Sequence, residues 1–183
     1  LRIDKIMSIF TMYLIFKIGN AILSLIFLKD FKLDLFQDSS APWYLLSLCI
    51  WYLFVPFMER IKPKYFILGS IFIGLIAGYF DIIKFVFSLS RVLVFFPFFA
   101  IGFYLSKENL ESFLNKRLRL LALTFLIGEF ICVVVFWKEL KPTYSILYGG
   151  TPYSEGLGKL ASYGMLLRGI WYVVTFITSA AVM

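Results

Sequence analysis

One arginine, Arg91, stands where a strongly apolar run begins, and two serines, Ser88 and Ser90, precede it closely. A guanidinium at the end of such a run costs free energy unless an anionic group binds it, which makes it a functional-site hypothesis in a membrane protein. Its N–H donors form a rigid planar fork that fits phosphate and carbonyl oxygens. The pattern therefore predicts a binding site with Arg91 at its centre, assisted by the two serine hydroxyls.

Three more charged residues interrupt apolar segments: Lys17, Glu129 and Arg168. Each costs about 2.5–3.5 kcal/mol at the centre of a membrane-spanning helix, so together they indicate a polar interior. Arg168 is the second candidate for a site residue. Glu129 is either a general base or the partner of Arg168 or Lys17 in an ion pair that holds helices together.

The composition indicates a membrane protein. Of the 183 residues, 61% are hydrophobic, whereas ordinary soluble domains contain about 45–50%. The excess apolar surface must face lipid. The net charge of +7 does not point to nucleic acid, because the cations lie between apolar runs and form no basic cluster among polar residues.

Six apolar segments divide the chain, and a spanning helix needs about 20 residues. The first, fifth and sixth segments are long enough as they stand, and the other three reach this length with flanking residues. The runs are continuous rather than alternating, which favours helices over strands. We predict an all-α, polytopic helical bundle that forms a single membrane domain over residues 1–183. The six segments are Ile6–Leu28, Trp43–Met58, Tyr65–Phe80, Val92–Leu105, Leu118–Trp137 and Leu160–Met183.

The short loops at 59–64 and 106–119 are dense in cations, which predicts that the N-terminal end of the chain is cytoplasmic. The short basic linker Ser112–Arg119 is interpreted as a solvated loop that sets the orientation and also touches anionic lipid headgroups. The chain starts without a methionine and stops within an apolar run, so we interpret it as an internal piece of a larger bundle, truncated at both ends.

Small residues and glycines mark two further features. Ser70, Gly74 and Gly78 recur at a spacing that lets two helices approach closely, and we interpret them as a packing face. The loop Tyr148–Gly158 is rich in glycine but lacks the Gly-Lys-Ser/Thr ending of a phosphate-binding loop. Either it lines an extracytoplasmic entrance with tyrosines that contact sugars, or it is a plain turn between helices.

Two motifs show a resemblance to a known family. The run Ala41-Pro-Trp-Tyr-Leu-Leu-Ser-Leu-Cys-Ile-Trp51, followed by Pro56, resembles the opening of a helix in the membrane acyltransferase 3 family. The run Phe87–Tyr104, with Ser-Leu-Ser-Arg and Phe-Phe-Pro-Phe-Phe-x-x-Gly, is similar to the corresponding segment of the fucose 4-O-acetylase-like branch. A later stretch, Arg168-Gly-Ile-Trp-Tyr, loosely matches an arginine-led helix of that branch.

The resemblance implies a multi-pass O-acyltransferase of the plasma membrane, expected to be an O-acetyltransferase. It implies transfer of an acyl group from acetyl-CoA to a sugar hydroxyl of a surface or exported glycan, with membrane lipids around the protein and with neither a bound cofactor nor a metal. The expected catalytic residues are then Arg91, Arg168 and Glu129. The expected substrate-binding residues are Ser88, Ser90, Trp43 and Tyr44, of which the two aromatic residues stack on a sugar.

The chain also departs from the family. Family members have a histidine on an early helix, and this chain contains no histidine. We therefore expect the base of the reaction to lie upstream, and this piece to be inactive alone. Tyr52 stands where relatives often have a basic residue, so we predict no charged role for the second helix.

Two alternatives stay open. Lys17, Glu129 and Arg168 would also suit a transporter or flippase for glycan precursors, although the two halves of the chain show no self-similarity. The chain could equally be an inactive fragment.

Overall fold

The computed structural model of the chain describes residues 3–28, 42–80, 89–105 and 116–182. Every regular element in these ranges is a helix, which confirms the all-α prediction for the described part. The long helices are α1 (Ile3–Leu28), α2 (Trp43–Met58), α3 (Pro63–Ile76), α4 (Leu89–Tyr104), α6 (Lys116–Val135) and α10 (Gly164–Val182). The short elements are η1 (Ala77–Tyr79), α7 (Trp137–Leu140), η3 (Lys141–Thr143), α8 (Tyr144–Tyr148), α9 (Tyr153–Leu157) and η4 (Gly158–Tyr163).

Local signals explain where several of these helices begin and end. Pro63 occupies the first turn of α3, where its missing N–H leaves no hydrogen bond unmade. Asp4 lies in the first turn of α1, where a carboxylate is favoured by the helix dipole. Gly149 ends α8 with a positive φ of 65°, a conformation that glycine adopts without steric cost.

Two helical stretches are long and apolar enough to cross a membrane, Ile3–Phe27 and Tyr153–Val182. Only 17% and 11% of the residues in their apolar windows are buried, whereas a core helix of a soluble protein would be mostly buried. The helices α2 and α4 have 16 residues each and α3 has 14, which is shorter than a typical span. Of the six predicted crossings, the described part of the chain therefore shows two helices that are long and apolar enough, and six crossings stay a prediction.

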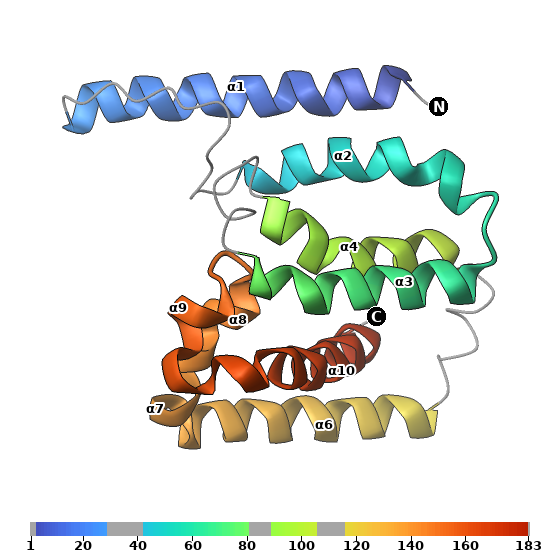
Figure 1. Cartoon of the computed structure of the whole chain (residues 1–183), viewed down its shortest axis with the longest axis vertical. Helices are drawn as coiled ribbons and strands as arrows, with labels where there is room; N and C mark the ends of the chain where they lie inside the picture. The colour runs from blue at the N-terminus through green and yellow to red at the C-terminus, as the bar shows by residue number, and fades with distance from the viewer. Residues whose placement is uncertain (1–2, 29–41, 81–88, 106–115, 183) are drawn as a thin grey trace.

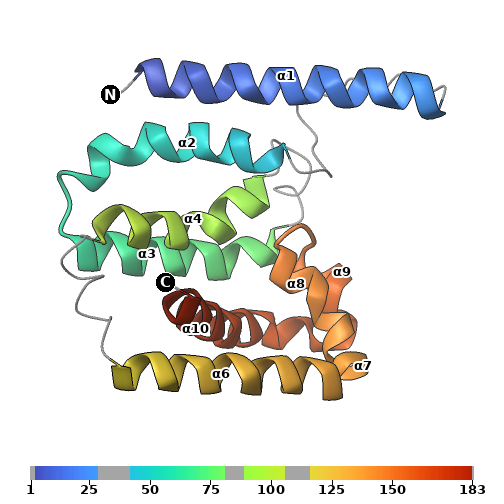
Figure 2. The same cartoon turned by 180° about the vertical axis from the view of Figure 1, so that it is seen from behind.

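The long helices run back and forth in one bundle (Figures 1 and 2). The helix α4 packs on α3 and α2, α1 packs on the outer side of α2, and α6 packs on α10 at the opposite edge. Because the chain direction alternates, the starts of α2, α4 and α10 meet at one end of the bundle, together with α7–α9. This end is called the α8–α9 end below.

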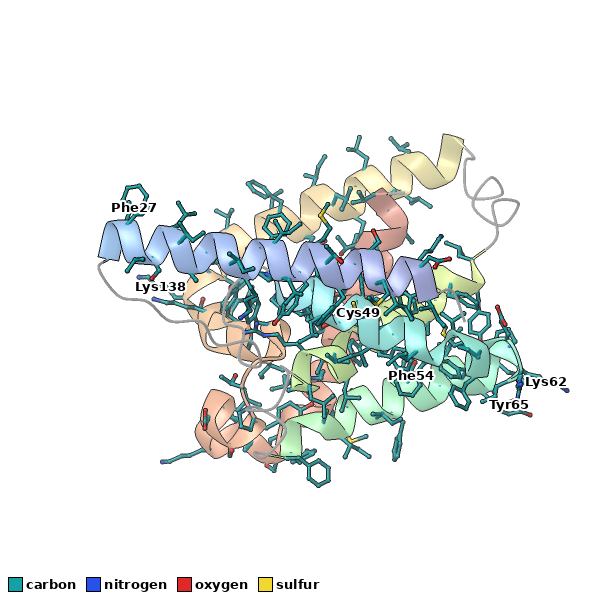
Figure 3. The ribbon with its side chains drawn as sticks, turned by 90° about the horizontal axis from the view of Figure 1, so that it is seen from above. Phe27, Cys49, Phe54, Lys62, Tyr65 and Lys138 are labelled. Carbon is teal, nitrogen blue, oxygen red and sulfur yellow. The ribbon has the colours of Figure 1, made fainter. Side chains whose placement is uncertain are left out.

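Figure 3 shows the two ends of the bundle from above. Phe27 and Lys138 lie at one end, and Lys62 and Tyr65 lie at the other, as expected for helices that alternate in direction. Cys49 of α2 is buried beneath α1, and its Sγ lies 3.8 Å from the carbonyl oxygen of Ile6.

The core lies between α2, α3 and α4. Trp51 of α2 packs on Val92 and Phe96 of α4, and its indole Nε1–H donates a 3.0 Å hydrogen bond to the carbonyl of Val92. Pro97 lies inside α4 and has no N–H to bind the carbonyl of Leu93 four residues earlier. One helical hydrogen bond of α4 is therefore absent beside the carbonyls of Val92 and Val94, which accept hydrogen bonds from side chains of α2 and α10.

The small-residue face is confirmed on α3. Ser70 and Gly74 are buried, and a Cβ on Gly74 would lie 3.1 Å from the backbone oxygen of Leu93 in α4. Such a contact is tighter than ordinary side-chain packing, so glycine is what allows the two helices to approach. Gly78 instead faces the ring of Tyr153, which belongs to the connection before α10.

Candidate functional site

Arg91 lies in the first turn of α4, at the α8–α9 end of the bundle. The carbon at the centre of its guanidinium is 4.1 Å from the ring centroid of Tyr148 and 5.5 Å from that of Trp43. The two rings meet nearly edge to face, with centroids 6.5 Å apart. Both contacts fall within the range of cation–π attraction, which is about 0.5–2 kcal/mol for a pair. We call Arg91, Trp43, Tyr148, Ser90, Gly149 and Gly150 the Arg91 cluster.

Two glycines let the chain after α8 close against α4. The backbone carbonyl of Gly149 accepts a 2.7 Å hydrogen bond from the Ser90 hydroxyl. A Cβ on Gly150 would lie 2.9 Å from Nη2 of Arg91, closer than real side chains approach. The absence of side chains on Gly149 and Gly150 therefore allows the backbone to lie directly beside the guanidinium of Arg91.

The structure brings together four of the residues predicted for this site. Arg91, Ser90 and Trp43 belong to the Arg91 cluster, and the half-exposed ring of Tyr44 meets Trp43 edge to face at 6.0 Å. Tyr44 also packs edge to face on Trp51, a residue of the core. Ser88 lies outside the described residues.

Arg168 occupies a different and fully buried position in the second turn of α10. Its Nη1 donates a 3.1 Å hydrogen bond to the carbonyl of Gly74, and the centre of its guanidinium lies 4.5 Å from the ring centroid of Tyr153. Its Nε and Nη2 have no hydrogen-bond partner among the described residues. Arg168 is thus a buried cation with part of its bonding capacity unused.

The two arginines lie on either side of one contact between α4 and α10. Tyr172, one turn after Arg168, donates a 2.7 Å hydrogen bond to the carbonyl of Val94. The side chain of Val94 in turn faces Gly149 of the Arg91 cluster, where an added Cβ would be 3.1 Å away. Both predicted arginines therefore lie at the α8–α9 end, in separate settings.

Glu129 is not part of this arrangement. It lies on α6 and accepts a 2.8 Å hydrogen bond from the Thr178 hydroxyl of α10. Thr178 is about 15 Å further along α10 than Arg168, at a rise of about 1.5 Å per residue. Within the described ranges Glu129 pairs with neither Arg168 nor Lys17, so the ion pair expected from the sequence is not formed there. Lys17 is buried on α1, and its Nζ lies 5.8 Å from the ring centroid of Tyr13.

Sequence reasoning missed two tyrosines that shape the Arg168 site. Tyr172 follows Arg168 by four residues, so its place on the same face of a helix could have been read from the helical period. Tyr153 belongs to the glycine-rich loop, and no spacing rule connects it with Arg168. Tyr148 was expected to line an entrance or to belong to a plain turn, and its contact with Arg91 depends on how the loop folds back.

The chain matches no protein-family model. It also shows no significant similarity to a curated protein or to a solved structure.

Proposed function

We propose that the chain is part of a multi-pass integral membrane O-acyltransferase, which transfers an acetyl or other acyl group from acetyl-CoA to a sugar hydroxyl of a surface or exported glycan. In this proposal all six long helices cross the plasma membrane, and the N-terminal end of the chain is cytoplasmic. The α8–α9 end then faces the opposite, extracytoplasmic side.

The observation that carries the proposal is the contact between the two motif segments. Trp43 belongs to the first segment that resembles the membrane acyltransferase 3 family, and Arg91 belongs to the second. The central carbon of the Arg91 guanidinium lies 5.5 Å from the ring centroid of Trp43. The two motifs lie far apart in the chain, so the meeting of their residues in one cluster supports the proposal that they act together. The family assignment itself remains a proposal.

The chemistry of acyl transfer suits a cluster of this composition. The acceptor hydroxyl attacks the thioester carbonyl carbon, a base takes the hydroxyl proton, and the tetrahedral oxyanion collapses with loss of the CoA thiolate. A guanidinium supplies a fixed positive charge for a phosphate or for the developing oxyanion. Aromatic rings such as Trp43 and Tyr44 offer flat apolar faces to a sugar ring.

We assign binding and charge stabilisation, and not proton removal, to the Arg91 cluster. The chain has no histidine, and Glu129 lies away from the cluster. An arginine does not release its proton under physiological conditions. The base of the proposed reaction is therefore a group outside this cluster.

The test is the O-acetyl content of the surface glycan, measured by NMR in cells that express the complete open reading frame. We expect Arg91→Ala to abolish or strongly reduce acetate per sugar at equal membrane abundance. The matched control is Lys138→Ala, which removes an exposed cation at the same end of the bundle and should leave acetate unchanged.

Two results would contradict the proposal. Equal acetate per sugar in wild type and Arg91→Ala would show that Arg91 has no role in acyl transfer. Loss of the glycan from the surface with unchanged acetate per remaining sugar would favour a transporter or flippase instead. In proteoliposomes, release of CoA from acetyl-CoA that depends on both protein and acceptor provides the direct readout of acyl transfer.

A further inference from the structure

The bonding of Arg168 leaves one edge of its guanidinium unused. Nη1 is bonded to the carbonyl of Gly74, while Nε and Nη2 have no partner among the described residues. These two nitrogens form the side-on edge of the group, where two N–H bonds point in parallel. This is the geometry that binds two oxygens of a carboxylate or phosphate at once.

No described group neutralises the charge of Arg168. Its side chain is fully buried, and its described neighbours are a backbone carbonyl and the rings of Tyr153 and Tyr172. Buried charges in folded proteins are paired or bound to ions, since an unpaired charge away from water is strongly disfavoured. Arg168 therefore has the properties of a site that is completed by an added anion.

The tyrosines hold the guanidinium in place without using its open edge. The Tyr153 hydroxyl donates a 2.9 Å hydrogen bond to the carbonyl of Leu75, and the Tyr172 hydroxyl donates to the carbonyl of Val94. The Tyr153 ring fits between Gly78 and Gly164, where any side chain would collide with it. The ring is thus fixed over one face of the guanidinium, and the Nε–Nη2 edge remains for another group.

We propose that the Nε–Nη2 edge of Arg168 binds an oxyanion, a phosphate or carboxylate group, at the α8–α9 end of the bundle. This site is separate from the Arg91 cluster and does not depend on acyl transfer. Arg168 lies in the second turn of α10, whose start belongs to the α8–α9 end of the bundle. The oxyanion therefore comes either from a soluble compound or from a lipid headgroup.

Two glycines flank the segment that carries Tyr153, the residue that covers the site. Tyr153 belongs to a segment bracketed by Gly149 and Gly158, whose φ angles of 65° and 52° are both positive. Glycines tolerate large changes in backbone angles, so rotation at these two positions would shift Tyr153 without breaking α8 or α10. Entry of the oxyanion requires such a shift, because Arg168 is fully buried when the ring is in place.

The test follows the Nε–H signal of Arg168 by NMR in the full-length protein, labelled with ¹⁵N at arginine Nε and held in a maltoside detergent that contains no phosphate. Arg168→Lys identifies the signal by its disappearance. Inorganic phosphate and, in parallel, acetate are titrated against chloride at equal ionic strength. We expect a saturable downfield shift and slower hydrogen exchange of the Arg168 signal with an oxyanion, and no such change with chloride.

A second measurement does not depend on assigning a signal. Phosphate should raise the thermal unfolding temperature of the wild type by linkage, and this increase should be lost in Arg168→Lys. Lysine keeps the positive charge but lacks the side-on pair of N–H groups, so its folding is less at risk than that of a neutral variant. The control Lys159→Gln removes an exposed cation and should keep the phosphate effect.

The arms of the experiment separate the sources of the oxyanion. A shifted signal in phosphatidylglycerol nanodiscs without added phosphate supports a lipid headgroup, and a shift that requires added phosphate or acetate supports a soluble ligand. Three results overturn the proposal: no change with any oxyanion, an equal change with chloride, or rapid exchange with water at all concentrations. Asp81 is the first acidic residue after α3 and η1 in the sequence. The proposal is also overturned if Asp81→Asn alters the Arg168 signal before any anion is added, because the chain would then supply its own carboxylate.

Discussion

The hydroxyl of Tyr172 donates a 2.7 Å hydrogen bond to the backbone carbonyl of Val94, and this contact joins α10 to α4 between the two arginines. Arg91 lies one turn before Val94, and Arg168 lies one turn before Tyr172. One hydrogen bond therefore joins the two helices that carry the arginines, at a point between them in the fold. The same contact lies beside Gly74, where the close approach of α3 leaves no room for a side chain.

Replacing Tyr172 by phenylalanine should lower stability by about 0.5–1.5 kcal/mol, the usual contribution of one hydrogen bond. The ring stays and only the hydroxyl is lost, so the packing against Phe98 and Phe176 is kept. Thermal unfolding of the purified protein in detergent measures the effect. Tyr163→Phe is the control, because Tyr163 is exposed and should give no change. Equal unfolding temperatures for wild type and Tyr172→Phe would show that the bond contributes nothing.

Replacing Gly150 by alanine should reduce acyl transfer more than it reduces stability. The added Cβ would lie 2.9 Å from Nη2 of Arg91, and the end of this flexible side chain can move away at little cost to folding. The guanidinium would then leave its position between Tyr148 and Trp43. O-acetyl content and unfolding temperature are measured on the same variant.

Gly128→Ala is the control for that experiment. Gly128 lies on α6 with nothing within 4 Å of an added Cβ, so alanine should leave acyl transfer unchanged. It should stabilise the helix by about 0.5–1 kcal/mol. If Gly150→Ala and Gly128→Ala give the same acetate content, the approach of Gly150 to Arg91 has no functional role.

The ring of Tyr148 should matter more than its hydroxyl. Its centroid lies 4.1 Å from the centre of the Arg91 guanidinium, and phenylalanine retains a negative ring face that attracts a cation. Tyr148→Phe should therefore keep most of the acetate content. Tyr148→Leu should lose it, because leucine removes a cation–π attraction to Arg91 of about 0.5–2 kcal/mol. An equal loss in both variants would point to the hydroxyl instead.

Glu129 and Thr178 should be coupled in stability. The 2.8 Å hydrogen bond between them joins α6 to α10. In a double-mutant cycle with Glu129→Leu and Thr178→Val, we expect a coupling energy of about 0.5–1.5 kcal/mol. Glu129→Gln should retain acyl transfer, because the residue lies away from the Arg91 cluster and the amide keeps a hydrogen bond to Thr178. Loss of acetate in Glu129→Gln would restore Glu129 as a candidate base.

Much of the helical organisation could be predicted from local sequence. The bounds of α2 agree with the predicted segment, since apolar runs and prolines are properties of contiguous residues. Other bounds moved: α4 begins at Leu89 and so includes Arg91, and α10 begins at Gly164 because Gly158–Tyr163 forms a 3₁₀ helix. The apolar segments of α2, α3 and α4 are also short in the sequence, and each reaches the length of a full span only with flanking residues.

The site was predictable only in part. The sequence alone determined an apolar all-α chain, a small-residue face on α3, and arginines that need a partner in an apolar setting, because composition and helical spacing are encoded locally. The tertiary structure decided that Tyr148 and Trp43 meet at Arg91, that Tyr153 covers Arg168, and that Glu129 bonds to Thr178 and not to an arginine. These contacts join residues far apart in the chain, and they depend on the register and crossing of packed helices, which no local pattern specifies.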